Sequence, residues 1–228
     1  MYYDLTSCSR KDFSLNFCTL KEASTAEVVE KKSRFIANSC HIESKEEAEE
    51  KINLIKKKYY DAKHNCFAFS IVDKDGNLLE KSSDDGEPSG TAGAPILNVI
   101  RKNNLNNVLI VVTRYFGGIL LGTGGLTRAY SNTALASIEN GKIIEVENGL
   151  QVSLEIEYSE NEKFKYYCEK NNIKIVETKY SENIIQKIEL NEEEYNKLIS
   201  KNMEINRQLP FKIKEIGILC RKFIEKVQ

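Results

Sequence analysis

The chain has 228 residues, 41% of them hydrophobic, and a formal net charge of −1. This length and composition support one large hydrophobic core or two smaller ones, which excludes disorder of the whole chain. Because acidic and basic residues are balanced along the sequence, a polycationic domain that binds nucleic acid mainly through phosphates is also excluded.

The cysteines and the hydropathy indicate the compartment. The six cysteines include no C-x-x-C pair, so a zinc site is not expected. Thiols in a chain with an ordinary core and no signal peptide are typical of a reduced, cytoplasmic protein. No apolar run reaches the roughly 20 residues of a membrane helix. We therefore expect a cytoplasmic protein with no metal, no cofactor and no membrane contact.

The first half of the chain predicts a mixed α and β domain. Residues 1–19 show no periodicity and are expected to form an N-terminal extension. Alternating residues predict strands between Ala26 and Ile42. Ser44 is a candidate N-cap, with Glu47 as its capping-box partner, for the helix KEEAEEKINLIKKKYYDAK. HNCFAFSIV and NLLEKS then read as a strand and its antiparallel return.

Three further elements complete this domain. Pro95 is a candidate helix start, and the apolar run VLIVVTRYF predicts a central strand. From Gly125, apolar residues at helical spacing predict a helix that stops at Gly141.

A change in composition near Glu145 marks a second domain. From there the patterns predict strand, helix, strand, strand, helix and strand, which is the split βαβ order of a ferredoxin-like domain. We therefore predict domains at residues 20–142 and 148–220, with a protease-sensitive hinge from Lys142 to Asn148.

Two glycine-rich segments mark the candidate site. Eight of the twelve glycines fall in DDGEPSGTAGAP and RYFGGILLGTGG. A strand followed by glycines and a helix N-terminus presents free N–H groups to a small anion, and Arg114 and Arg128 bracket the second segment. Alternatively, the glycines permit a tight bend and close packing of the helix. The sequence leaves both interpretations open.

The acidic residues of the first segment also have more than one interpretation. Asp84, Asp85 and Glu87 could bind a divalent cation, but the EF-hand spacing is absent and such residues favour turns and helix starts. The turn interpretation is therefore preferred. One of these carboxylates is also a candidate partner for Arg114, which would join the two glycine segments across a cleft.

His64 and Cys66 suggest a Cys/His nucleophile. Catalytic Cys/His partners usually come from distant parts of a chain, so we prefer a buried cysteine beside a hydrogen-bonded histidine. His41, at a strand end, is expected at the surface.

HNC, DDGEPSGTAGAPIL and RYFGGILLGTGGLTRAYS together resemble the YigZ/IMPACT family, and the match covers about residues 20–142. The C-terminal segment is similar to the small second domain of bacterial YigZ proteins. The resemblance implies an α+β protein with a ribosomal protein S5 domain 2-like first domain and a ferredoxin-like second domain. It also implies translation regulation: IMPACT proteins of eukaryotes compete for a protein that activates a stress-responsive initiation-factor kinase.

The motif positions give a candidate ligand-binding surface and no catalytic role. Its residues are His64, Asp84, Asp85, Glu87, Arg114, Tyr115, Gly117, Gly118, Gly122, Gly124, Gly125 and Arg128.

The leading interpretation is a cytoplasmic regulatory protein linked to translation, which contacts RNA, the ribosome or a translation-associated protein through a glycine-rich cleft. The alternative is a phosphate- or nucleotide-binding enzyme in which the loop Gly117–Gly125 holds a phosphate and Asp85 or Glu87 acts as base. An exposed apolar patch near Tyr115 and Phe116 would favour a protein partner.

Overall fold

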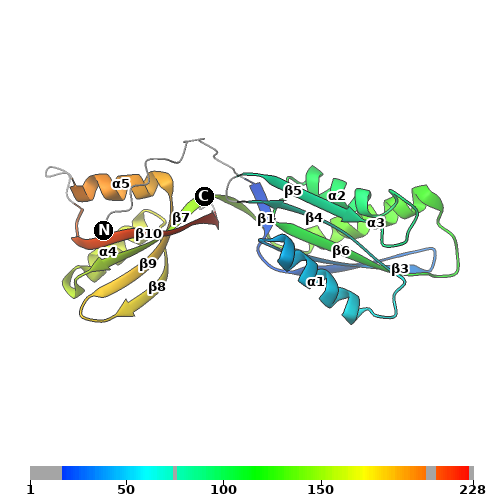
Figure 1. The fold of residues 1–228 in the computed structure, drawn as a ribbon, viewed down its shortest axis with the longest axis horizontal. Coiled ribbons are helices and arrows are strands. Elements are labelled where there is room, and N and C mark those ends of the chain that lie inside the picture. The colour runs from blue at the N-terminus through cyan, green and yellow to red at the C-terminus, as the bar shows by residue number, and fades with distance from the viewer. Residues whose placement is uncertain (1–16, 74–75, 204–208, 226–228) are drawn as a thin grey trace.

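The computed structural model of the protein describes residues 17–73, 76–203 and 209–225, which form two units placed end to end (Figure 1). Each unit has an antiparallel sheet with helices packed on it. The chain is therefore α+β, as the sequence predicted.

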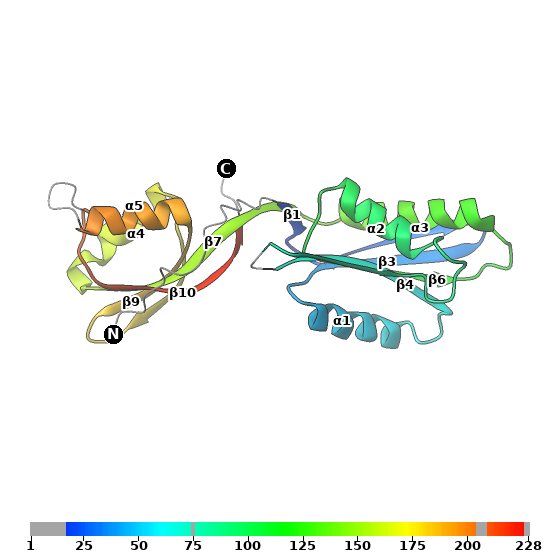
Figure 2. The ribbon, with the colours of Figure 1, turned by 45° about the horizontal axis from the view of Figure 1, so that its top comes forward.

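The N-terminal unit is built on a five-stranded sheet in the order β2-β3-β6-β4-β5. Its strands are β2 (Ser24–Glu30), β3 (Ser33–His41), β4 (His64–Val72), β5 (Leu78–Ser83) and β6 (Val108–Tyr115). The central strand β6 is buried as far as Arg114, as its apolar run predicted. Helices α2 (Gly93–Lys102) and α3 (Gly122–Glu139) cover one face of the sheet, and α1 (Lys45–Lys58) covers the other (Figure 2).

Helix α1 begins where its capping signal predicts. The Glu47 N–H donates to the Ser44 hydroxyl at 3.1 Å, which confirms Ser44 as the N-cap. The Glu47 carboxylate, however, accepts a hydrogen bond from the Glu43 N–H at 2.8 Å, one residue before the position of a standard capping box. Ala48 and Ile52 form the buried face of this helix, which packs against the sheet.

Both helices on the opposite face begin earlier than predicted. Helix α2 starts at Gly93 rather than Pro95, and α3 starts at Gly122 rather than Gly125. A β-carbon at position 93 would lie 2.7 Å from the Ser83 nitrogen, so glycine lets this end of α2 sit against the end of β5. Part of the second glycine segment is therefore helix rather than loop.

The C-terminal unit has the sheet order β10-β7-β9-β8, with every neighbouring pair antiparallel. This is the ferredoxin-like arrangement predicted from the order of its elements. The elements are β7 (Ile143–Ile156), the short 3-10 helix η1 (Tyr158–Glu160), α4 (Asn161–Lys170), β8 (Lys174–Tyr180), β9 (Ile184–Asn191), α5 (Glu192–Met203) and β10 (Ile213–Glu225). Strand β10 thus continues past residue 220, the predicted end of the domain.

A single strand joins the two units. Strand β7 pairs through residues 143–146 with β1 (Phe17–Leu20), and through residues 146–156 with β10. Most of the segment expected to be a hinge is therefore strand. Strand β1 also begins inside the expected extension, while residues 1–16 lie outside the described residues.

Side chains reinforce this junction. The rings of Phe17 and Phe223 meet edge to face at 4.8 Å between centroids, and Lys21 forms an ion pair of 2.6 Å with Glu225. Within the described residues, no helix is long and apolar enough to cross a membrane.

Candidate functional site

The two glycine segments meet at one end of the N-terminal sheet. Residues 84–92 connect β5 to α2, and residues 116–121 connect β6 to α3. The β2–β3 turn and residues 59–63 reach the same end, because Arg34 pairs with Tyr115 and His64 pairs with Arg114 in the sheet. We call this region, together with the last turn of α1, the distal end. It lies opposite the junction with the C-terminal unit (Figure 1).

A buried ion pair joins the two glycine segments. Arg114 Nη1 lies 2.7 Å from Glu87 Oε1, and their side chains are 7% and 3% exposed. The Tyr130 hydroxyl donates to the same carboxylate oxygen at 2.9 Å, and Arg114 Nη2 donates to the Ser33 hydroxyl at 3.4 Å. A carboxylate does pair with Arg114, as one interpretation of the sequence proposed. The pair is enclosed, however, rather than placed across an open cleft.

Aromatic rings enclose the same guanidinium. The ring centroids of Phe35 and Phe116 each lie 5.5 Å from Arg114 Cζ, within the range of cation–π attraction. Phe35 is fully buried and packs edge to face on Tyr130, whereas Phe116 is 55% exposed. Arg114 therefore links the core of the unit to a side chain on its surface.

Asp84 organises the entry to α2. Its carboxylate accepts hydrogen bonds from the main-chain N–H groups of Gly90, Ala92 and Gly93 at 2.8, 2.9 and 2.8 Å. Burial opposes ionisation of this carboxyl, but the three donors outweigh that effect and lower its pKa. Asp84 thus satisfies the start of α2, whose N-cap, Ala92, offers no side-chain acceptor.

Asp85 fixes the neighbouring turn. Its carboxylate accepts from the Lys56 ammonium at 2.8 Å and from the Asn65 N–H at 2.7 Å. Its carbonyl oxygen lies 2.9 Å from His64 Nδ1, which donates to it when protonated there. Asp84, Asp85 and Glu87 therefore turn toward different partners, and the described residues contain no cluster of three potential metal ligands.

Cys66 is fully buried next to this turn. Its thiol donates to the Asp84 carbonyl oxygen at 2.9 Å and lies 3.3 Å from the Tyr130 hydroxyl. Burial raises the pKa of the thiol to about 12, which makes it a poor nucleophile at neutral pH. The structure therefore agrees with the interpretation that we preferred for the HNC segment, in which a buried cysteine lies close to a hydrogen-bonded histidine.

The loop between β6 and α3 packs against the β2–β3 turn. A β-carbon on Gly117 would lie 2.0 Å from the Lys32 carbonyl carbon, and the Gly117 N–H donates to the Ser33 hydroxyl at 3.1 Å. Beyond this contact the loop turns outward, and Ile119 and Leu120 are 43% and 83% exposed. Close approach explains Gly117, and the loop it anchors presents apolar side chains to solvent.

The residues of the predicted anion site lie partly at the start of α3 and partly inside the fold. Gly122, Gly124 and Gly125 lie in the first turn of α3, where the N-cap residue, Leu121, provides no side-chain acceptor. Arg128 is exposed on the next turn, with Nη1 4.0 Å from the β-carbon position of Gly124. Arg114 does not contribute, because its charge is already paired with Glu87 inside the fold.

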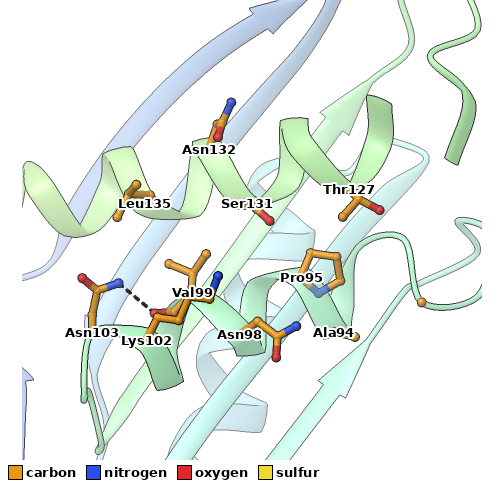
Figure 3. Close-up of a pocket in the computed structure, with 11 residues that line it drawn as sticks. Ala94, Pro95, Asn98, Val99, Lys102, Asn103, Thr127, Ser131, Asn132 and Leu135 are labelled. Atoms are coloured by element: carbon orange, nitrogen blue, oxygen red, sulfur yellow. Dashed lines mark hydrogen bonds between the residues drawn. The ribbon is translucent and has the colours of Figure 1, made fainter. Parts of the chain in front are cut away.

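A separate groove of about 480 Å³ runs between α2 and α3 (Figure 3). Apolar side chains line it together with amide, hydroxyl and ammonium groups, and sequence reasoning did not find it. The lining residues are Gly90, Ala94, Pro95, Asn98, Val99, Lys102, Asn103, Thr127, Ser131, Asn132 and Leu135. The only signal in the sequence is the helical spacing of Thr127, Ser131 and Leu135, which equally suits an ordinary helix face.

Among the predicted site residues, His64 and Asp85 form one contact and Glu87 and Arg114 form another. Tyr115 joins neither contact, because its hydroxyl donates to Asp61, in the loop after α1, at 2.7 Å. Sequence reasoning missed Ser33, Phe35 and Tyr130, which complete the setting of the ion pair.

Comparisons with known proteins agree with this architecture. Residues 31–138 match the Impact N-terminal domain, and residues 154–201 match a domain of unknown function, DUF1949. The IMPACT family member YvyE of Bacillus subtilis (strain 168) is 41% identical over 176 residues, which span 68% of this chain and 80% of YvyE. The chain therefore belongs to the IMPACT family, as the motifs indicated.

Similarity extends to a eukaryotic relative and to a solved structure. A protein IMPACT homolog of Dictyostelium discoideum is 42% identical over 97 residues, which cover 42% of this chain and 28% of that protein. A crystal structure described as that of a hypothetical protein has a TM-score of 0.60 and 27% identity, and the alignment covers 87% of this chain and 96% of that one.

Proposed function

We propose that this protein is a cytoplasmic regulatory protein linked to translation, and that it contacts a translation-associated partner, the ribosome or RNA through its distal end. The observation that carries this proposal is the division of roles at that end. Glu87 and Arg114, one from each glycine segment, bond to each other inside the fold, while Phe116, Ile119 and Leu120 face solvent. Contiguous exposed apolar side chains are a feature of interaction surfaces.

The enzyme alternative is less well supported by the geometry. It requires Asp85 or Glu87 to act as a base toward a bound phosphate compound. Asp85 already accepts hydrogen bonds from Lys56 and Asn65, and Glu87 accepts from Arg114 and Tyr130. The oxygen atoms of both carboxylates are therefore already engaged by donors of the fold, and neither carboxylate is positioned to take a proton from a substrate.

Family membership supports the link to translation. The resemblance to IMPACT proteins of eukaryotes implies a regulator that works by competing for a partner protein, and such a role requires a recognition surface and no turnover. The Arg128 side chain and the first turn of α3 add a contact for a small anion or a phosphate at the edge of the same surface.

The test is a reconstituted translation reaction supplemented with the purified protein. We expect the wild-type protein to change the yield of a reporter, and a Phe116→Ser/Leu120→Ser variant to lose this effect. Tyr166→Ser is a matched control, because Tyr166 is 65% exposed on α4, in the other unit. Equal effects of the wild-type protein and the Phe116→Ser/Leu120→Ser variant would contradict the proposed surface.

A further inference from the structure

We propose that the distal end binds an acidic polypeptide segment of a partner protein, one that carries large apolar side chains among its carboxylates. This inference rests on the proposed function and specifies the chemistry of its partner. It follows from three features of the distal end: its exposed aliphatic residues, its exposed lysines that form no ion pair with the described residues, and the hydrogen-bonded contacts that hold these two groups together.

The apolar part of the surface suits protein side chains. Phe116 is 55% exposed, Ile119 43%, Leu120 83% and Tyr60 86%. Single-stranded nucleic acids are usually held by aromatic platforms on which bases stack. Ile119 and Leu120 provide no such platform, and they gain most by burial against other aliphatic or aromatic side chains. Phe116 and Tyr60 can stack on a base or pack on a side chain, so the two aliphatic residues are what favour a polypeptide over RNA.

The charged part of the surface is basic, although the whole chain carries a net charge of −1. Exposed lysines lie on the β2–β3 turn and around the end of α1, and none of them forms an ion pair within the part of the chain that the structure describes. They are Lys31, Lys32, Lys57, Lys58 and Lys63.

The carboxylates of this end are mostly engaged already. Glu27 pairs with Arg34, Asp61 accepts from Tyr115, and Asp85 pairs with Lys56. Glu30 is the acidic neighbour of Lys31 in the turn. The excess of positive charge is complementary to an acidic partner, and such complementarity speeds association and excludes basic competitors.

The apolar and basic parts are held in a fixed relationship. Gly117 lies directly against Lys32, and its N–H donates to the Ser33 hydroxyl. The loop that carries the apolar side chains is therefore bonded to the β2–β3 turn that carries the lysines. The bond between Tyr115 and Asp61 ties the end of β6 to the loop after α1. A surface that is ordered before binding loses less entropy when a partner docks.

The test is a fluorescence titration of the full chain with defined probes. The first probe is a labelled synthetic peptide in which leucine and glutamate repeat at helical spacing. The second has glutamine in place of every glutamate, and the third is a single-stranded RNA oligonucleotide with the same net charge as the first peptide. We expect the acidic peptide to bind most tightly.

Variants of the chain assign the site. Lys31→Glu/Lys32→Glu should weaken peptide binding about tenfold at low salt, because attraction becomes repulsion. Leu120→Ser should also weaken it about tenfold, because an exposed anchor is lost. Lys102→Glu and Leu135→Ser, in the groove between α2 and α3, are matched controls that should leave the affinity unchanged. Thermal melts of each variant separate loss of binding from loss of folding.

Several outcomes would overturn the inference. Tighter binding of the RNA than of the acidic peptide would assign the lysines to phosphates, and equal binding of the glutamine peptide would remove the role of charge. If no peptide binds while the Phe116→Ser/Leu120→Ser variant still loses its effect on translation, the inference fails and the proposed function stands. If the wild-type protein has no effect on translation either, both fail.

Discussion

Arg114 Nη1 and Glu87 Oε1, 2.7 Å apart and enclosed by the fold, connect the strand β6 to the loop that precedes α2. The Tyr130 hydroxyl bonds to the same carboxylate, so strand, loop and helix α3 meet at one oxygen atom. The charges of the glycine segments therefore serve first to hold the distal end together.

Removing one member of this pair should destabilise the protein. In Glu87→Gln the Arg114 charge stays buried without a countercharge, and breaking a buried pair in this way costs about 3–5 kcal/mol. Urea unfolding followed by circular dichroism measures the loss. The control is Arg128→Met, because Arg128 is an exposed arginine near the start of α3. This change should alter the free energy of unfolding by less than about 0.5 kcal/mol. A loss below about 1 kcal/mol in Glu87→Gln would contradict the enclosed pair.

The glycines of the second segment should differ in their tolerance of alanine. Gly117→Ala places a β-carbon 2.0 Å from the main chain of Lys32, so the loop must move away from the turn. Gly118→Ala meets no atom within 4 Å and bears only the strain of φ +82°, which costs about 1 kcal/mol. The melting temperature of Gly117→Ala should therefore be lower than that of Gly118→Ala. The reverse order would show that the loop does not approach the turn.

Asp84 should make stability depend on pH in the acidic range. Because the pKa of this carboxyl is lowered in the folded state, its contribution is present above its unfolded pKa of about 3.9 and is lost as the pH falls through the folded pKa. Asp84→Asn lacks this contribution. The difference in melting temperature between wild type and Asp84→Asn should be largest near pH 7 and should narrow below about pH 4. A difference that stays constant over this range would contradict the role of the carboxylate.

The junction between the units should resist proteases. Residues 143–146 are paired with β1, and residues 146–156 lie between β9 and β10 for most of their length. A protease needs an extended, unpaired segment, so brief digestion followed by mass spectrometry should find no early cut from Ile143 to Gly149. An early cut there would restore the hinge that the sequence alone suggested.

Local signals in the sequence predicted much of the fold. Ser44 marked the start of α1, and the order of elements after Glu145 was enough to predict the ferredoxin-like sheet. These features depend on residues close together in the chain. The predicted hinge shows the limit of such local signals. Glycine content and composition change near Glu145, but pairing with the distant strand β1 makes this segment a strand.

The candidate site was less predictable. Asp84, Asp85 and Glu87 all precede Arg114 by about 30 residues, so only the three-dimensional arrangement selects Glu87 as its partner. Tyr130 reaches this pair because α3 packs against β2 and β3 on the same face of the sheet, which no motif specifies. The glycine segments located the region, and long-range packing decided which side chains face inward.

The sharing of β7 also determines where the chain can be divided. A chain cut after Lys142 would keep β1 but remove the strand that it pairs with, leaving Phe17 and Leu20 without their pairing partners, Val146 and Ile143. A chain cut after Glu147 would retain that pairing and lose only the part of β7 that belongs to the second sheet. The smallest autonomous version of the N-terminal unit therefore ends within a strand that both units use.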